Sequence, residues 1–150
     1  MNNYFIKKEK IKFKHVDYAG IVFYPRFLEM LNDLVEDWFE EGLDRPFSKM
    51  HETNGIPTVD LKVQFKKAAR LGDILTKKLW VKNLGGASIL CGFQFEDENG
   101  KRFLFDYDER GELASRDIVS KSIYLYKKKT GMQVYLAFNN FDEKLVFSLI

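Results

Sequence analysis

The chain has 150 residues, of which 45% are hydrophobic and 15% aromatic, and this composition predicts one folded globular domain over residues 1–150. Its 24 basic and 22 acidic residues leave a net charge of +2, so charge gives no argument for a nucleic acid or an anionic membrane as a partner. The first residues contain no apolar signal core, and no apolar run approaches the ~20 residues of a membrane span, so we expect a cytoplasmic protein.

The first strand is expected at residues 4–13, where Ile11 and Phe13 alternate with lysines. Aromatic residues between lysines on one strand can bind a phosphate backbone. A solvated strand face is the simpler interpretation here, because the chain as a whole is nearly neutral.

A long amphipathic helix is expected directly after Pro25. Pro25 suits the first helical turn, and Gly42 suits a left-handed position just past the end. Between them, apolar residues recur at helical spacing: Phe27, Met30, Leu31, Leu34, Trp38 and Phe39. The helix would begin a few residues after Asp17. Free backbone N–H groups and the positive end of the helix dipole would then lie near a carboxylate, which suits polarisation of a carbonyl.

Three strands are expected after the helix, at residues 57–66, 74–83 and 87–97. Apolar and polar residues alternate clearly in the first of them, and Gly72 and Gly85–Gly86 mark short turns between them. Short turns between neighbouring strands predict an antiparallel meander. The expected fold class is therefore α+β, with one sheet packed on one long helix.

The segment at residues 99–110 combines acidic and aromatic side chains. We expect it to form a hairpin extension or a mobile flap that flanks a binding pocket, with glycines near its ends as hinges. A further strand is expected near 113–127 and a helical turn near 143–149.

Few residues are candidates for metal binding or nucleophilic chemistry. His15, His51 and Cys91 lie far apart in the sequence and match no zinc signature, so we expect no metal. Cys91 alternates with apolar residues and is interpreted as a small buried hydrophobe. The sequence also lacks a Gly-x-Ser-x-Gly elbow, which argues against a serine hydrolase.

The stretch from Asp17 to Pro25, together with the helix behind it, resembles the motif of hotdog-fold acyl-CoA thioesterases of the 4-hydroxybenzoyl-CoA thioesterase type. The resemblance covers roughly residues 5–135. It implies a hotdog fold, in which a curved antiparallel sheet wraps one long helix. It also implies a homodimer or homotetramer with active sites at the subunit interface. The implied substrate is an acyl-CoA, with coenzyme A as part of the substrate and no separate cofactor.

The same resemblance implies roles for individual residues. Asp17 matches the catalytic carboxylate, which acts as nucleophile or general base, and the backbone N–H of Tyr24 would face the thioester carbonyl. The residues around this motif are candidates for substrate contacts: His15, Gly20, Ile21 and Val22. Judged from residue type alone, Asp17 is better explained as a turn or capping residue, and His15 as a structural or solvent-facing residue.

Two departures from the family pattern concern the loop and the nucleotide. Tyr18 stands where relatives often carry proline, and the turn at residues 83–87 lacks arginines that some relatives place there for the nucleotide of coenzyme A. Lys66, Lys67 and Arg70 are the alternative candidates for binding the phosphates, although a charged strand end has the same composition.

Three functions remain open at this point. The first is hydrolysis of an acyl-CoA. The second is thioester hydrolysis or dehydration of acyl groups on acyl carrier protein, and the third is acyl-CoA binding without catalysis. The aromatic-rich sequence admits aromatic and aliphatic acyl groups alike.

Overall fold

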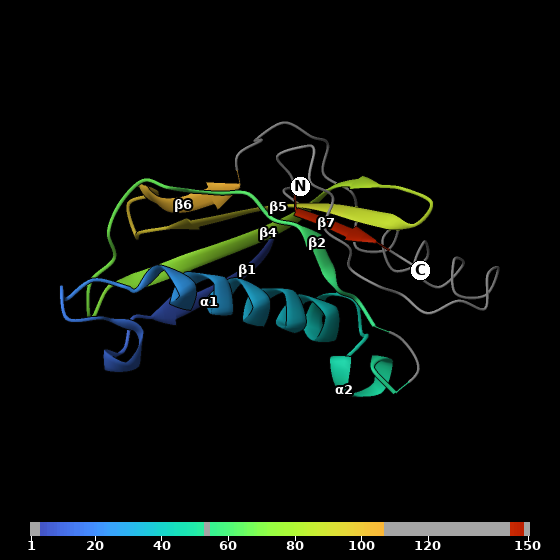
Figure 1. The fold of residues 1–150 in the computed structure, drawn as a ribbon, viewed down its shortest axis with the longest axis horizontal. Coiled ribbons are helices and arrows are strands. Elements are labelled where there is room, and N and C mark those ends of the chain that lie inside the picture. The colour runs from blue at the N-terminus through green and yellow to red at the C-terminus, as the bar shows by residue number, and fades with distance from the viewer. Residues whose placement is uncertain (1–3, 53–54, 107–144, 149–150) are drawn as a thin grey trace.

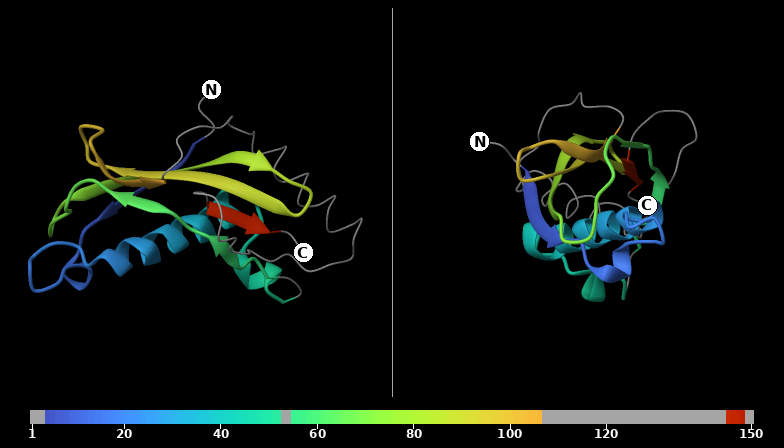
Figure 2. Two further views of the ribbon diagram at one scale, coloured as in Figure 1. Left: turned by 45° about the horizontal axis from the view of Figure 1, so that its top comes forward. Right: turned by 90° about the vertical axis from the view of Figure 1, so that its left-hand side faces the viewer.

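The structure of the protein is a computed structural model that describes residues 4–52, 55–106 and 145–148. In these residues one antiparallel sheet curves over one long helix, as Figure 1 and both views of Figure 2 show. The elements in chain order are β1 (Phe5–Lys10), a 3₁₀ turn (Phe13–His15), α1 (Tyr24–Asp37), a π turn (Trp38–Gly42), α2 (Phe47–Met50), β2 (Thr58–Asp60), β3 (Val63–Phe65), β4 (Ile74–Leu84), β5 (Ser88–Glu96), β6 (Arg102–Asp106) and β7 (Leu145–Ser148). This architecture confirms the predicted α+β class.

The described strands of the sheet follow the order β1-β4-β5-β6-β3, and β7 pairs with both β5 and β2. β6 lies against the end of β5 at residues 94–96, and β7 lies against its beginning at residues 88–91. β6 and β7 therefore lie end to end along the same side of β5. In the next position outward, β3 pairs with β6 and β2 pairs with β7, so β3 and β2 also lie end to end.

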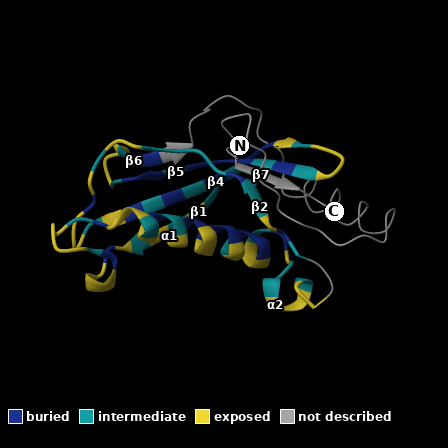
Figure 3. Ribbon diagram, viewed as in Figure 1, coloured by how far each residue is buried: buried dark blue, intermediate teal, exposed yellow. Residues whose placement is uncertain are grey.

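The core lies between the concave face of the sheet and α1. The buried residues of α1 recur at helical spacing: Phe27, Met30, Leu31, Leu34 and Val35. They face the inward rows of β4 and β5, which contribute Leu75, Leu79, Val81, Ile89, Cys91, Phe93 and Phe95. Figure 3 shows the resulting division, with buried residues toward the sheet and exposed residues on the opposite side of α1. The predictions of an amphipathic helix and of a buried Cys91 are confirmed.

The end of the long helix differs from the prediction. The α-helical hydrogen bonding ends at Asp37 and continues as a π turn to Gly42, and the left-handed residue is Asp44, with φ 56°. Gly42 is needed for space instead, because a Cβ atom there would lie 2.5 Å from Cδ1 of Trp38. Glycine at this position therefore lets the indole ring lie against the backbone.

The predicted meander is wrong in its first hairpin. The segment at 57–66 forms β2 and β3, which pair with β7 and β6, while β4 pairs with β1 and β5. The turn expected at residues 71–73 is present, since the N–H of Asp73 donates to the carbonyl of Arg70 at 3.0 Å, but it does not pair β3 with β4. The residues before it run beside the turn that precedes α1, where the N–H of Val22 donates to the carbonyl of Ala69 at 2.8 Å. The hairpin of β4 and β5 is as predicted.

Of the two forms expected for residues 99–110, the described part forms the hairpin and not the mobile flap. Residues 102–106 form β6, which is paired on both sides, so the hairpin is an integral part of the sheet. Residues 107–110 and the strand expected near 113–127 lie outside the described residues. Near the end of the chain, residues 145–148 form β7 rather than the helical turn expected there. The prediction of a single domain over 1–150 stays a prediction.

Candidate active site

Asp17 lies at the start of a tight turn that precedes α1. Its N–H donates to the carbonyl of Ile21 at 3.0 Å, and its carbonyl accepts from the N–H of Gly20 at 3.0 Å. Gly20 adopts φ 73°, a left-handed conformation that suits glycine. The Asp17 carboxylate accepts from the N–H of Ala19 at 2.8 Å and is exposed. This part of the chain therefore forms a turn in which one oxygen of the Asp17 carboxylate accepts a backbone hydrogen bond and the other oxygen faces solvent.

Tyr24 is the first residue of α1. Phe23 lies directly before the helix, and Pro25 lies in its first turn. Phe23 is the N-cap residue and makes no side-chain cap hydrogen bond. The first N–H groups of an α-helix have no partner within the helix, and the helix dipole gives this end a partial positive charge. The start of α1 can therefore receive an oxygen that carries or develops negative charge.

Backbone contacts tie the Asp17 turn to the helix start and to the segment after β3. Val16 and Val22 form a bridge across the turn, and Ile21 forms a bridge with Arg70. The fold thus brings the segment that contains Arg70 beside the turn that contains Asp17, although more than fifty positions separate them in the sequence. Val22 itself is buried in the core, whereas Ile21 is half-buried.

The candidate phosphate-binding residues differ in their surroundings. Lys67 forms an ion pair with Asp97, with Nζ 2.7 Å from Oδ2, and its Nζ lies 4.7 Å from the ring centroid of Phe103. Hydrogen bonds from Lys67 and from the backbone N–H of Lys101 lower the pKa of Asp97. Lys66 and Arg70 are exposed. The charge of Lys67 is therefore already matched by a carboxylate.

Aromatic side chains run from the helix start into the core. The ring of Tyr24 lies 5.6 Å from that of Phe23 and 6.3 Å from that of Phe65 on β3. Phe65 in turn lies 6.0 Å from Phe27, which lies 6.4 Å from Phe95. Phe23, Tyr24 and Phe65 are exposed, whereas Phe27 and Phe95 are buried. An apolar surface thus lies next to the backbone N–H of Tyr24.

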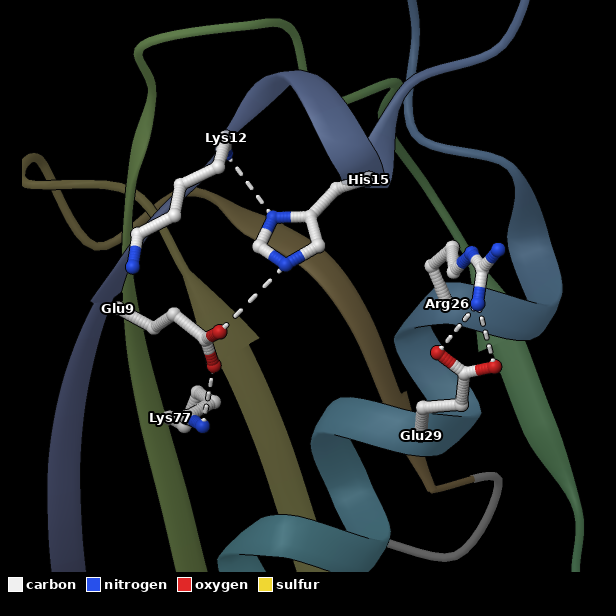
Figure 4. A network of polar contacts seen from close by, with 6 residues as sticks. All are labelled: Glu9, Lys12, His15, Arg26, Glu29 and Lys77. Carbon is white, nitrogen blue, oxygen red and sulfur yellow. Dashed lines mark hydrogen bonds and ion pairs between the residues drawn. The ribbon is translucent and has the colours of Figure 1, made fainter.

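His15 is buried in a polar network, with 5% of its surface exposed (Figure 4). Its Nδ1 accepts from the N–H of Lys12 at 2.9 Å, and its Nε2 lies 3.8 Å from Oε1 of Glu9. The other oxygen of Glu9 lies 2.6 Å from Nζ of Lys77, whose side chain is almost wholly buried. Burial is the main cause that lowers the pKa of His15, and the carboxylate of Glu9 opposes this shift.

Two adjoining grooves run along this network, between β1 and α1. One has a volume of about 220 Å³ and is lined by Glu9, Lys14, His15, Arg26, Glu29, Met30 and Asp33. The other has a volume of about 490 Å³ and is lined by Lys7, Lys8, Glu9, Asp33, Glu36, Asp37 and Lys77. Neither groove includes Asp17 or Tyr24.

Reasoning from the sequence missed Glu9 and Lys77. Glu9 was visible only as an acidic residue in a run of lysines, and Lys77 as a lysine in the inward row of β4, between Leu75 and Leu79. A lysine in an apolar row is costly to bury without a partner, which is a signal that an acidic residue lies opposite.

No helix in residues 4–52 and 55–106 is long and apolar enough to cross a membrane. Within the same described part of the chain, His, Cys, Asp and Glu side chains form no group of three that could hold a metal ion.

A curved antiparallel sheet that wraps one long helix is the hotdog fold. Comparison with known families agrees, since residues 11–116 match the Thioesterase-like superfamily. The chain belongs to this superfamily.

Solved structures with the same fold include several thioesterases. A gentisyl-coenzyme A thioesterase is 25% identical, with a TM-score of 0.62 over 67% of this chain and 80% of that one. A 1,4-dihydroxy-2-naphthoyl-CoA thioesterase from Synechocystis is 16% identical, with a TM-score of 0.65 over 86% of this chain and 98% of that one. A Staphylococcus aureus protein solved in complex with CoA is 12% identical, with a TM-score of 0.66 over 83% of this chain and 84% of that one.

Curated relatives match only a short part of this chain. An L-aspartate oxidase of Saccharolobus solfataricus is 47% identical over 51 residues, which are 32% of this chain and 11% of that protein. An L-aspartate oxidase of Synechocystis is 51% identical over 39 residues, which are 26% of this chain and 7% of that protein. The chain thus spans about a tenth or less of the length of these relatives.

Proposed function

We propose that this domain hydrolyses the thioester of an acyl-CoA to a free acid and coenzyme A. The observation that carries the proposal is the position of Asp17, in a turn that is paired through Val16 and Val22 and through the bond from the Phe23 N–H to the His15 carbonyl, directly before α1 begins at Tyr24. One exposed carboxylate and one free helix terminus supply the two groups that thioester hydrolysis needs.

In the proposed reaction, the N–H of Tyr24 donates to the thioester oxygen and stabilises the negative charge that develops there. Asp17 acts in one of two ways. As a general base, it takes a proton from water while the water oxygen attacks the carbonyl carbon. As a nucleophile, its carboxylate attacks and forms an anhydride, which water then hydrolyses. In both cases the carbon–sulfur bond breaks and the coenzyme A thiolate leaves and takes up a proton.

The acyl group proposed for this site is aromatic. Three exposed rings, those of Phe23, Tyr24 and Phe65, lie beside the helix start, and aromatic pairs add about 0.5–1.5 kcal/mol beyond the area that they bury. The gentisyl-coenzyme A and 1,4-dihydroxy-2-naphthoyl-CoA thioesterases named among the structural neighbours act on aromatic acyl groups, which agrees with this choice. The narrower resemblance to the 4-hydroxybenzoyl-CoA type is part of the same proposal.

Arg70 is the residue that we propose for binding the coenzyme A phosphates, with Lys66 beside it. Arg70 is exposed, and its backbone pairs with Ile21 in the turn that contains Asp17. Lys67 is a weaker candidate than the sequence indicated, because an anion would compete with Asp97 for its charge.

The site is proposed to be completed by a second copy of the chain in a homodimer, which can pair further into a homotetramer. β1 and β3 each pair with one strand only among the described residues. β1 carries four charged residues in six, which discourages edge pairing, whereas β3 reads Val-Gln-Phe and carries none. Pairing through β3 would place the partner next to Phe65 and the helix start.

A thiol-release assay with matched acyl-CoA substrates tests this proposal. Benzoyl-CoA and hydroxybenzoyl-CoA should turn over faster than hexanoyl-CoA, and the same acyl groups on acyl carrier protein should turn over slowly. A preference for the carrier protein would favour the second function considered above. Tight binding without thiol release would favour the non-catalytic one. Sedimentation equilibrium at micromolar concentration tests the dimer, and a 17.7 kDa species alone would contradict it.

A further inference from the structure

The buried network around His15 is linked to both groups of the proposed active site. The ring of His15 holds the N–H of Lys12 at 2.9 Å, which fixes the 3₁₀ turn at residues 13–15. The backbone carbonyl of the same residue accepts from the N–H of Phe23 at 3.1 Å, and Phe23 precedes the first residue of α1. Asp17 follows His15 by two positions. His15 therefore links the segment that leads to Asp17 with the start of α1.

The hydrogen bond from Lys12 constrains the protonation state of this ring. Nδ1 can accept from the N–H of Lys12 only when it carries no proton, so the neutral ring carries its proton on Nε2, which faces Glu9. A second proton, on Nδ1, would place two N–H groups against each other and break the contact with Lys12. The structure of the turn thus requires neutral His15.

Glu9 and Lys77 hold the other side of the ring. Their ion pair spans 2.6 Å, and Lys77 lies in the inward row of β4, where only 3% of its surface is exposed. Apolar residues of similar volume often replace such a buried pair without loss of stability. The pair therefore contributes little net stability, but it gives the Nε2–H of His15 a fixed negative neighbour.

We propose that neutral His15 is a positioning residue for the proposed thioester hydrolysis, because its ring and its carbonyl hold the Asp17 turn in place against the start of α1. This inference rests on the proposed function for its catalytic consequence. Its structural part stands by itself: Lys12 should lose its hydrogen bond to the ring when the ring is protonated or removed, and the bond from Phe23 to the backbone carbonyl of His15 should then weaken because the turn is no longer held.

Charged groups from every neighbouring element face this ring. They are Glu9 on β1, Lys12 and Lys14 in the adjacent turn, Arg26, Glu29 and Asp33 on α1, and Lys77 on β4. Arg26 is paired with Glu29 at 2.8 Å. Burial together with Lys12, Lys14 and Arg26 favours the neutral ring, and Glu9 favours the charged one. Protonation of His15 should therefore begin below the pH at which a free imidazole titrates.

The test compares two substitutions at position 15. In His15→Asn, the side-chain oxygen can occupy the place of Nδ1 and accept from Lys12, but it cannot be protonated. In His15→Leu, the volume is similar and the acceptor is absent. We expect His15→Leu to lower kcat about tenfold or more with KM changed less than about twofold, because a misplacement of about 1 Å at the reacting groups can cost ~10²-fold. His15→Asn should restore kcat to within about threefold of the wild type.

The pH profile separates positioning from simple structural support. Wild-type kcat should fall on the acid side of the pH at which a free imidazole titrates, because burial lowers the pKa of His15, whereas His15→Asn should lack this acid limb. Glu9→Gln removes the charge that favours protonated His15, so the acid limb should move to lower pH. The double variant Glu9→Gln/Lys77→Met should show the same shift without leaving a buried lysine unpaired. The control Glu40→Gln, an exposed change in the π turn after α1 and outside both grooves, should leave the profile unchanged.

Amide hydrogen exchange at Lys12 and Phe23 gives a readout that needs no activity. Exchange should quicken at both residues in His15→Leu and remain slow in His15→Asn. The positioning role is refuted if His15→Leu keeps wild-type kcat and slow exchange, or if His15→Asn keeps the acid limb. If the wild type cleaves no thioester while exchange responds as expected, the proposed function fails and the structural role of His15 stands.

Discussion

Asp17→Asn tests the catalytic assignment while it preserves the turn. The Asp17 side chain accepts one hydrogen bond, from the N–H of Ala19 at 2.8 Å, and an amide oxygen can accept the same bond. The side chain is exposed, so the free energy of unfolding should change by no more than about 0.5 kcal/mol. The substitution removes only the negative charge and the basicity of the group.

The expected effect on turnover is large by comparison. Loss of a positioned base or nucleophile lowers kcat by at least ~10²-fold, which corresponds to about 2.7 kcal/mol in the activation free energy. Asp17→Glu should also be slow, because the added methylene moves the carboxylate by about 1 Å and disturbs the near-attack geometry. Asp17→Ala should lose the same activity and also about 1 kcal/mol of stability, because Ala19 loses its acceptor.

Thiol release at saturating aromatic acyl-CoA measures turnover, and urea unfolding with sedimentation checks that the variants are folded and associated. The structural interpretation of Asp17 makes the opposite prediction, since a turn residue can be replaced by asparagine without loss of activity. A folded Asp17→Asn protein with wild-type kcat would therefore refute the catalytic role.

Three further predictions follow from the site. Gly20→Ala should lower the free energy of unfolding by about 1–2 kcal/mol because Gly20 has φ 73°, whereas Gly86→Ala, with open space around it, should change little; equal midpoints in urea for both variants would contradict this. Stability should fall as pH drops below about 6.5, because the lowered pKa of His15 lets the unfolded chain bind its proton first, and His15→Asn should remove this part of the pH dependence in thermal unfolding. Arg70→Glu should raise KM for an acyl-CoA but not for the matching acyl-N-acetylcysteamine, and an equal change for both substrates would exclude phosphate binding by Arg70.

The helices and strands whose structure depends on residues close together in the sequence were predictable from the sequence. The apolar spacing from Phe27 to Phe39 determines an amphipathic helix wherever the sheet lies, because its period follows from the geometry of one helix. The alternation in β4 and β5 and the glycines between them determine a hairpin for the same reason. The motif from Asp17 to Pro25 indicated a thioesterase-like family, and the match of residues 11–116 to the Thioesterase-like superfamily confirms that broader assignment.

Strand pairing across long separations was not predictable in the same way. β4 pairs with β1 rather than with β3, because the segment between β3 and β4 first pairs with the Asp17 turn, through Arg70 and Ile21, and only then turns into β4. The alternation of apolar and polar residues with a period of two indicates which face of a strand is buried, but it does not indicate which strand lies beside it.

The contacts around the candidate site also depend on the tertiary structure, because they join residues that are far apart in the sequence. Asp17 and Tyr24 are close in the sequence, so their shared position at the helix start could be derived from a turn and a helix boundary. Glu9, which faces His15, is paired with Lys77 on β4, and the partner of Lys67 is Asp97, which directly follows β5. Charges that meet only when separate strands pack together change the protonation and the availability of these groups, and no local pattern in the chain encodes that contact.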